Sequence, residues 1–240
     1  MKNQMQKKCL HTGLTALAVA ALAIAALPVL AERVDVSVIG TILPNACVPN
    51  LAGGGTIDYG AIHPSHLNAV SHTVLTEKNV DFTIVCDAPA KIAIRATNGR
   101  PATMAGVTEA AHGAAQTPVT VFSSAGEAGV GLGLAPDSAK IGGYGLRIQP
   151  NSVLADDAAV DTIYSHDNGV TWQTTNVGSV YHHTDIREIT WAATGTTTPI
   201  AFTTLSGKLS AHAYLNNTTE LNVVSPIVLD GYTTLELVYL

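Results

Sequence analysis

Histidines and one aspartate occur at spacings that could hold a metal ion. His63 and His66 are three residues apart in "HPSH", and His182 and His183 are adjacent with Asp185 nearby. Imidazole nitrogens and carboxylate oxygens are common zinc ligands. However, the proline between the first two favours a turn, and neighbouring side chains on a strand point to opposite faces. We therefore expect exposed polar histidines, and predict neither a metal site nor a cofactor.

The stretch 165–172, "SHDNGVTW", has the strongest likeness to an enzyme signature. It fits the Asp-box pattern S-x-D-x-G-x-T-W and resembles a hairpin of sialidase propellers. Those propellers carry several boxes, whereas this chain has one, and its arginines lie in no recognisable motif. Serine, histidine and aspartate are available for a triad, but the sequence lacks a nucleophile elbow. We predict no catalytic residue and no enzyme, and a carbohydrate-active enzyme is the least favoured function.

The same stretch predicts a local structure. Asp167 can accept backbone N–H bonds, the Asn and Gly that follow tolerate the positive φ of a tight turn, and Trp172 can cover the hairpin. Tyr164 and Thr171 are then expected in paired antiparallel strands. The residues that carry this Asp-box hairpin are Ser165, Asp167, Gly169, Thr171 and Trp172.

The first 31 residues have the three parts of a secretory signal peptide. Three lysines precede an apolar run from Leu14 to Leu30, and "VLA" ends at Ala31. The run is short and flanked wrongly for a membrane anchor, and its proline fits cleavage better. We predict export with cleavage after Ala31, and no membrane span afterwards.

The chain predicted to remain, residues 32–240, is acidic. It has nine Lys plus Arg against eighteen Asp plus Glu, so its net charge is −9. Nucleic-acid binding depends on clustered basic side chains that neutralise phosphates. Nucleic acid is therefore not expected as a partner.

Two cysteines, Cys47 and Cys86, remain after cleavage. An even count in an exported protein favours a disulfide over reactive thiols. Closing a loop of this length stabilises a fold by roughly 4 kcal/mol in the chain-entropy model. A thiol metal site is the alternative, but the sequence lacks a second cysteine pair.

Alternating apolar and polar residues, with turn residues between them, indicate an all-β sandwich. We predict one domain, residues 32–240, with "LSG" at 205–207 among its turns. The region of roughly 100–190 is expected to be a long insertion. The predicted strands lie at 34–42, 80–86, 90–96, 117–124, 144–149, 198–205, 208–215 and 233–240.

The two ends of this domain resemble the subunits of fimbriae assembled by the chaperone-usher route. In that family a first strand with a glycine leads to a cysteine that is bridged to a later strand, and the last strand has alternating apolar residues and a penultimate tyrosine. Gly40, Cys47, Cys86, Gly231 and Tyr239 match in kind and order. Over most of the chain the sequence is also similar to the periplasmic GltF-type family of unknown function, through "PNACVPNLAGGGTIDYG", "GLGLAPDSAKIG" and the final "VYL".

The fimbrial resemblance implies an immunoglobulin-like, pilin-type sandwich with its last-strand position incomplete. A periplasmic chaperone and then another fimbrial subunit would supply the missing strand by β-strand addition. The protein would lie in the periplasm or in a cell-surface fimbria of a Gram-negative bacterium, as a structural or adhesin subunit that could meet a surface glycan or protein ligand. The expected partner-strand residues are Gly231, Leu235, Leu237, Tyr239 and Leu240.

The sequence departs from the fimbrial pattern at its beginning. Cleavage after Ala31 leaves two residues before the alternation of Val34, Val36 and Val38 begins. Those valines are either a donor strand or the first strand of the domain. The alternative function is a self-contained periplasmic accessory or binding protein of the GltF type, with a complete sandwich and no role in a fibre.

Overall fold

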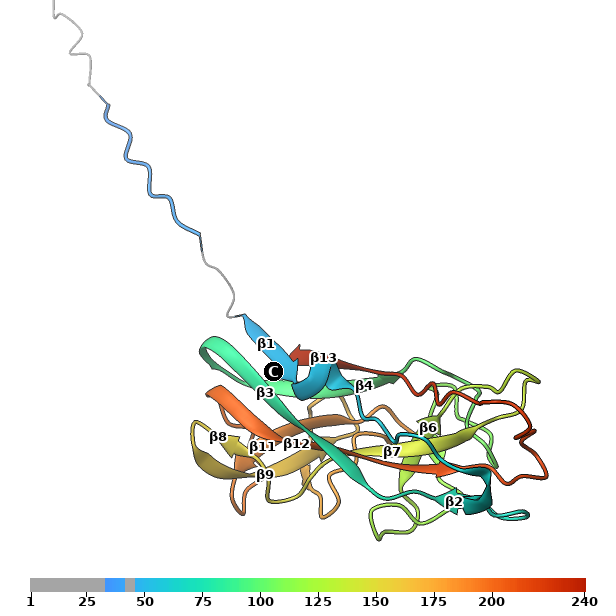
Figure 1. Ribbon diagram of the computed structural model, residues 1–240. Coiled ribbons are helices and arrows are strands. Elements are labelled where there is room, and N and C mark those ends of the chain that lie inside the picture. The colour runs from blue at the N-terminus through green and yellow to red at the C-terminus, as the bar shows by residue number, and fades with distance from the viewer. Residues whose placement is uncertain (1–32, 42–45) are drawn as a thin grey trace, which may run out of the picture. The chain divides into compact units, whose positions relative to one another are not determined.

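The computed structural model describes residues 33–41 and 46–240 (Figure 1). The predicted signal peptide, residues 1–31, lies outside these ranges. The chain divides into two compact units, Met1–Ile42 and Leu43–Leu240, and every strand belongs to the second. The described residues are almost entirely strand and turn, which confirms the all-β class.

In the described part of the chain the structure has thirteen strands and two short 3₁₀ segments, and Figure 1 labels most of the strands. The strands are β1 (Cys47–Leu51), β2 (Thr73–Val74), β3 (Lys78–Ala90), β4 (Ile92–Asn98), β5 (Ala115–Gln116), β6 (Ala128–Gly131), β7 (Gly142–Ile148), β8 (Leu154–Ala155), β9 (Ala158–Ser165), β10 (Gln173–Thr174), β11 (Glu188–Ala193), β12 (Phe202–Leu215) and β13 (Thr233–Tyr239). The 3₁₀ segments are η1 (Ala52–Gly55) and η2 (Pro64–His66).

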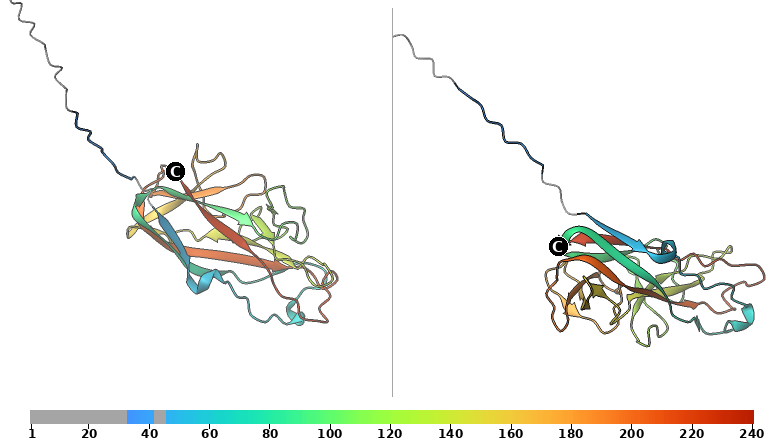
Figure 2. Two further views of the ribbon diagram at one scale, coloured as in Figure 1. Left: turned by 90° about the horizontal axis from the view of Figure 1, so that it is seen from above. Right: turned by 60° about the vertical axis from the view of Figure 1, so that its left-hand side comes forward.

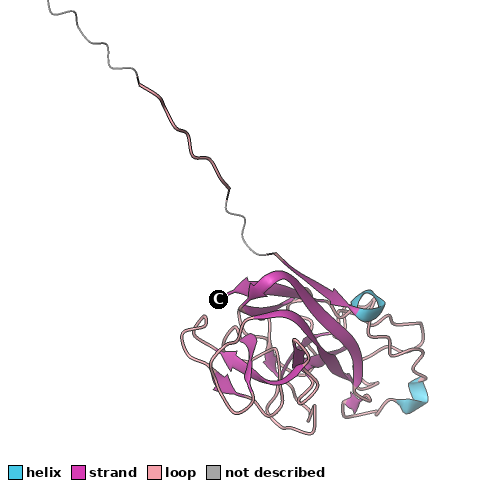
Figure 3. Cartoon of the chain, turned by 90° about the vertical axis from the view of Figure 1, so that its left-hand side faces the viewer, coloured by secondary structure: helices cyan, strands magenta, loops and turns pink. Residues whose placement is uncertain are grey.

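The strands pair antiparallel in two main groups. One runs β1–β3–β12–β7–β6, with β2 and β8 also on β12 and the short β5 on β6. The other runs β13–β4–β11–β9–β10. The β8–β9 hairpin joins the two groups, and the chain also passes between them at Lys91, between β3 and β4. Figures 2 and 3 show the two layers from other sides.

The core lies between the two groups because alternate residues of their strands point inward. Trp191 on β11 is fully buried, and its ring stacks on Phe82 of β3 at a centroid distance of 6.3 Å. It also meets Phe202 of β12 edge-on at 5.7 Å. Strands from both groups therefore share one hydrophobic core.

Strand β12 is longer than the sequence predicted. The expected turn at 205–207 does not form, because Leu205 and Gly207 pair with β3 inside one continuous strand. A Cβ at Gly207 would lie 2.7 Å from the ring of Phe82. This glycine lets the strand pass close to an aromatic side chain, and it does not mark a turn.

A further prediction for the middle of the chain differs from the structure. The expected strand at 117–124 is absent from the described fold, because Phe122 and Ser123 have positive φ and form a tight turn bridged by Val121 and Ser124. The region 100–190, expected to be an insertion, supplies β5 to β10. Its strands β7 and β9 pair along β12 and β11, so this region contributes to both groups of strands.

Candidate functional site

Strand β13 lies at an edge of its group of strands. It pairs with β4 along its whole length, from Thr233 opposite Asn98 to Tyr239 opposite Ile92. Among the described residues no strand pairs with the other side of β13, which we call its free edge. An unpaired strand edge presents backbone N–H and C=O groups that another chain can bind.

The inward residues of β13 are incompletely covered. Leu235 and Leu237 pack against the main core but remain half-buried, whereas Ile92 and Ile94 on the neighbouring β4 are buried. An edge strand has a neighbouring strand on one side only, so its inward side chains are covered less completely than those of an inner strand. The partial exposure of these leucines therefore follows from the missing neighbour at the free edge.

Strand β1 lies close to the end of β13, as the views in Figures 1 and 2 show. Cys47 is directly opposite Cys86 in the β1–β3 ladder, and the two form the predicted disulfide, with Cα atoms 4.0 Å apart. The backbone N–H of Cys47 also donates to the hydroxyl of Tyr239 at 2.8 Å. A single hydrogen bond thus connects β1 with β13, and no ladder between them occurs in the described residues.

The five predicted partner-strand residues fall into two sets. Leu235, Leu237 and Tyr239 lie in β13, while Gly231 precedes it and Leu240 follows it. A Cβ at Gly231 would lie 2.8 Å from the ring of Tyr144, so close packing explains this glycine. The N–H of Leu240 donates to the carbonyl of Lys91 at 3.0 Å, which anchors the end of the strand.

The segment 33–41 contains the possible donor strand. The sequence predicted a strand here, but the described residues 33–41 form neither helix nor strand. The side chains of Val34, Val36 and Val38 are 87%, 85% and 92% exposed. Alternation alone does not produce a strand, because the backbone groups also need a partner. The first strand of the domain is β1, which begins at Cys47.

The Asp-box residues form a turn between β9 and β10. Ser165 donates its hydroxyl proton to Asp167 at 2.6 Å, and accepts the N–H of Gly169 at 3.0 Å. Asp167 accepts both the N–H and the hydroxyl of Thr171, at 2.9 and 2.6 Å. The hydroxyl of Ser165, followed by the two donors of Thr171, lowers the pKa of Asp167 to about 2.

The turn is longer than the sequence predicted. Tyr164 pairs with Gln173, and Thr171 lies outside the strand because Asp167 holds it in the turn. Asn168 and Gly169 have the positive φ expected of them, at 57° and 79°. The half-buried Trp172 lies against Gly169, where an added Cβ would be 3.3 Å from its ring.

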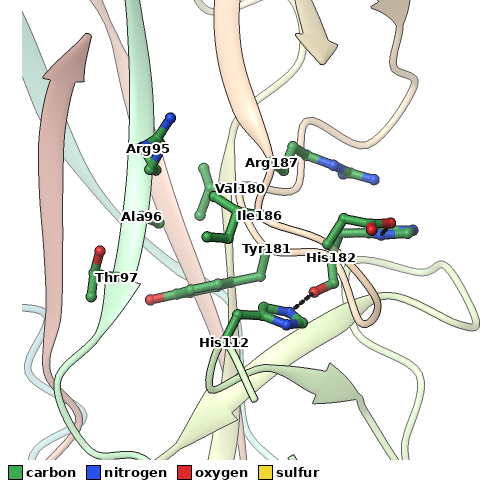
Figure 4. A pocket seen from close by; sticks show the side chains of 10 residues that line it. Arg95, Ala96, Thr97, His112, Val180, Tyr181, His182, Ile186 and Arg187 are labelled. Carbon is green, nitrogen blue, oxygen red and sulfur yellow. Dashed lines mark hydrogen bonds and ion pairs between the residues drawn. The ribbon is translucent and has the colours of Figure 1, made fainter. Parts of the chain in front are cut away.

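A cavity of about 240 Å³ lies between β4 and the segment that leads into β11 (Figure 4). Arg95 and Thr97 line one side, and Tyr181, His182 and Arg187 line the other. Both of its arginines have interaction partners. Arg95 pairs with the buried Glu188, and Arg187 donates to the carbonyl of Ser179 at 2.9 Å while lying over the ring of Tyr164.

The histidines are arranged differently from the sequence prediction. His63, which precedes η2, and His66, which ends it, are exposed, as expected. His182 and His183 are half-buried and lie outside any strand, with ring centroids 4.5 Å apart, so the argument from opposite strand faces fails. The ring of His166 lies 4.2 Å from that of His182.

Sequence reasoning missed His166, because it occupies a variable position of the Asp box and lies sixteen residues before His182 in the chain. The turn that follows β9 and the loop that precedes β11 meet because β9 and β11 are paired strands, with Ser165 opposite Glu188. That pairing was not visible in the sequence. The one signal in the sequence was the presence of a histidine in this motif, because the defining residue types of the motif all serve the geometry of the turn.

Comparison with known proteins identifies a matching family and two similar proteins. Residues 36–145 match the family described as "Protein of unknown function (DUF1120)". The chain is 30% identical to Protein GltF of Escherichia coli (strain K12) over 251 residues, which cover 98% of this chain and 99% of GltF. It is 28% identical to Uncharacterized protein YhcF of the same organism over 230 residues, covering 88% and 92%.

One general feature agrees with export. The disulfide is typical of proteins that fold in an oxidising compartment, such as the periplasm. In residues 33–41 and 46–240, no helix has the length and apolar character needed to cross a membrane.

Proposed function

This chain belongs to the GltF family, and we propose that it is an exported subunit of the fimbrial type that receives a β-strand from another polypeptide. It acts through protein contacts and catalyses no reaction. The observation that carries the proposal is the free edge of β13, with Leu235 and Leu237 left half-buried beneath it. A strand added there would satisfy the backbone groups of β13 and bury both leucines.

The segment 33–41 has the properties of the strand that is needed. Its sequence, "RVDVSVIGT", places Val34, Val36 and Val38 on one side of an extended chain, and all three are exposed. Bound along the free edge of a second copy, those valines would face the core beside Leu235 and Leu237. A periplasmic chaperone would hold the same edge before assembly, and fibre formation would place the protein at the cell surface.

The alternative is a self-contained periplasmic accessory or binding protein. Two observations favour it. The relatives of the chain, Protein GltF and Uncharacterized protein YhcF, support it at least as well as the fimbrial role. In addition, the hydroxyl of Tyr239 accepts the N–H of Cys47 and so connects the end of β13 with β1. If this contact closes the edge, the sandwich needs no partner.

A complementation experiment distinguishes the two functions. Val36→Asp with Val38→Asp disables the donor segment, and Leu237→Asp disables the acceptor edge. Each variant alone should remain monomeric in size-exclusion chromatography, and their mixture should form one-to-one dimers, because each supplies what the other lacks. The unmodified chain should form larger oligomers.

Val224→Asp is the matched control, since Val224 is an exposed valine outside the strands. It should assemble like the unmodified chain. An unmodified chain that is recovered from the periplasm as a stable monomer, without any bound chaperone, contradicts the fimbrial function and favours the alternative.

A further inference from the structure

The strongest cluster of metal-ligating groups among the described residues involves the Asp-box turn. His166, His182 and Asp185 each offer one ligand atom, and these atoms all lie within 4.8 Å of one another. Nδ1 of His182 is 3.5 Å from a carboxylate oxygen of Asp185. Two ligands bound tetrahedrally to zinc, each about 2.1 Å from the ion, are about 3.4 Å apart.

We propose that His166, His182 and Asp185 form a binding site for a divalent transition-metal ion of the Zn²⁺ class. The donor set is two imidazole nitrogens and one carboxylate oxygen, which suits Zn²⁺ better than the all-oxygen preference of Ca²⁺ or Mg²⁺. With three protein ligands, a fourth coordination position stays open to water or to another donor.

The unused hydrogen-bonding capacity of the His166 ring supports this site. Nδ1 of His166 is buried without a hydrogen-bond partner, and so is Nδ1 of the adjacent His183. Buried polar atoms normally have partners, so a ring nitrogen of the cluster that lacks one is consistent with a ligand absent from this structure.

The protonation states also fit. Burial, followed by the charge of Arg187, lowers the pKa of His182 to about 4, and the same two causes lower the pKa of His166. Burial therefore favours the neutral form of both rings. The hydroxyl of Thr184 lowers the pKa of Asp185, which keeps this carboxylate charged.

The surroundings hold the ligands in place. The hydrogen bonds of Ser165 and Asp167 fix the turn that carries His166, and its ring lies edge-on to Tyr164 at 5.0 Å. The carbonyl of His182 accepts a hydrogen bond from Nε2 of His112 at 2.8 Å (Figure 4). This support from neighbouring groups means that little reorganisation is needed when the metal binds.

The cavity gives the open coordination position a place to exchange ligands. His182 and Asp185 line the cavity of about 240 Å³ as well as forming part of the cluster. The positive charge of Arg187 opposes a cation here, but the carboxylates of Asp167 and Asp185 act on His166 in the opposite sense. The bound metal would connect the turn after β9 with the loop before β11.

Isothermal titration of the chelator-treated full-length mature chain with ZnCl₂ tests the proposal. We expect one Zn²⁺ per chain, and no competition from CaCl₂ or MgCl₂. His166→Ala and His182→Ala should each weaken binding at least about tenfold, since even the loss of a group that supports a ligand costs 10- to 100-fold. Asp185→Asn, an exposed and nearly isosteric change, should weaken binding without affecting the fold.

The double variant His63→Ala, His66→Ala is the matched control, because it removes two exposed histidines at the two ends of η2 and leaves the cluster intact. It should bind Zn²⁺ like the unmodified chain. NMR of the histidine ring nitrogens should show that His166 and His182 shift with one equivalent of Zn²⁺. Absent binding, equal binding of Ca²⁺, unchanged affinity in the Asp185→Asn variant, or loss of affinity in the control would each overturn the site.

Discussion

Strands β12 and β13 have the same alternation of apolar residues but very different surroundings. β12 pairs with β3 and β2 on one side and with β7 and β8 on the other, and its inward residues are buried. β13 pairs with β4 alone, and its inward leucines are half-buried. The pattern of a strand thus decides which side chains face the core, while the number of neighbouring strands decides how completely they are buried.

The largest expected effect is a difference between two leucines. Leu205→Ala on β12 should lower the free energy of unfolding by about 2–5 kcal/mol, because Leu205 is fully enclosed and its removal leaves a cavity. Leu237→Ala on β13 should cost about 1 kcal/mol, because less apolar surface is lost and water can enter. Urea unfolding of both variants measures the difference.

Equal costs would show that the edge of β13 is as well covered as β12, which contradicts the free edge. A bound partner strand should raise the cost of Leu237→Ala and leave that of Leu205→Ala unchanged. The cost of Leu237→Ala therefore also shows whether a partner strand is bound to β13.

A smaller effect is expected where β13 meets β1. Tyr239→Phe removes the acceptor for the N–H of Cys47 and should cost about 0.5–1.5 kcal/mol. Hydrogen exchange at the amide of Cys47 should become faster as well. Tyr232→Phe, just before β13, is the control, because its hydroxyl has no hydrogen bond among those of the described residues. Unchanged exchange at Cys47 would mean that the contact does not protect this edge.

The smallest effect concerns the start of β12 and depends on pH. The N–H of Thr204, followed by the N–H of Thr203 and the hydroxyl of Thr204, lowers the pKa of Asp156 below 3.8. The stabilisation is therefore present above about pH 4 and is lost as the pH falls through the lowered pKa. Asp156→Asn keeps a residue that tolerates the φ of 46° but carries no charge.

Thermal unfolding of the unmodified chain and the Asp156→Asn variant from pH 2 to pH 6 measures this effect. The difference between their midpoints should be constant above pH 4 and should shrink toward pH 2. A difference that is independent of pH would mean that the charge of Asp156 does not hold the start of β12.

Several elements could be predicted because their causes are local. Alternation in 80–86, 90–96 and 233–240 gives β3, β4 and β13, and an even number of cysteines in an exported chain gives the bridge between Cys47 and Cys86. The Asp-box residues encode their own turn through hydrogen bonds that span four residues or fewer. The GltF-type resemblance came from stretches that lie along the chain, so it needed no knowledge of contacts.

The remaining features depend on which strands become neighbours. Three features became visible only in the tertiary structure. Among the described residues, the segment 33–41 has no strand partner, and β13 has a free edge. Strand β12 continues through Gly207, which lies against the ring of Phe82. The approach of His166 to His182 likewise follows from the β9–β11 ladder. Periodicity fixes the side to which a side chain points, but pairing between distant segments is decided by the packing of the whole core, which no local pattern encodes.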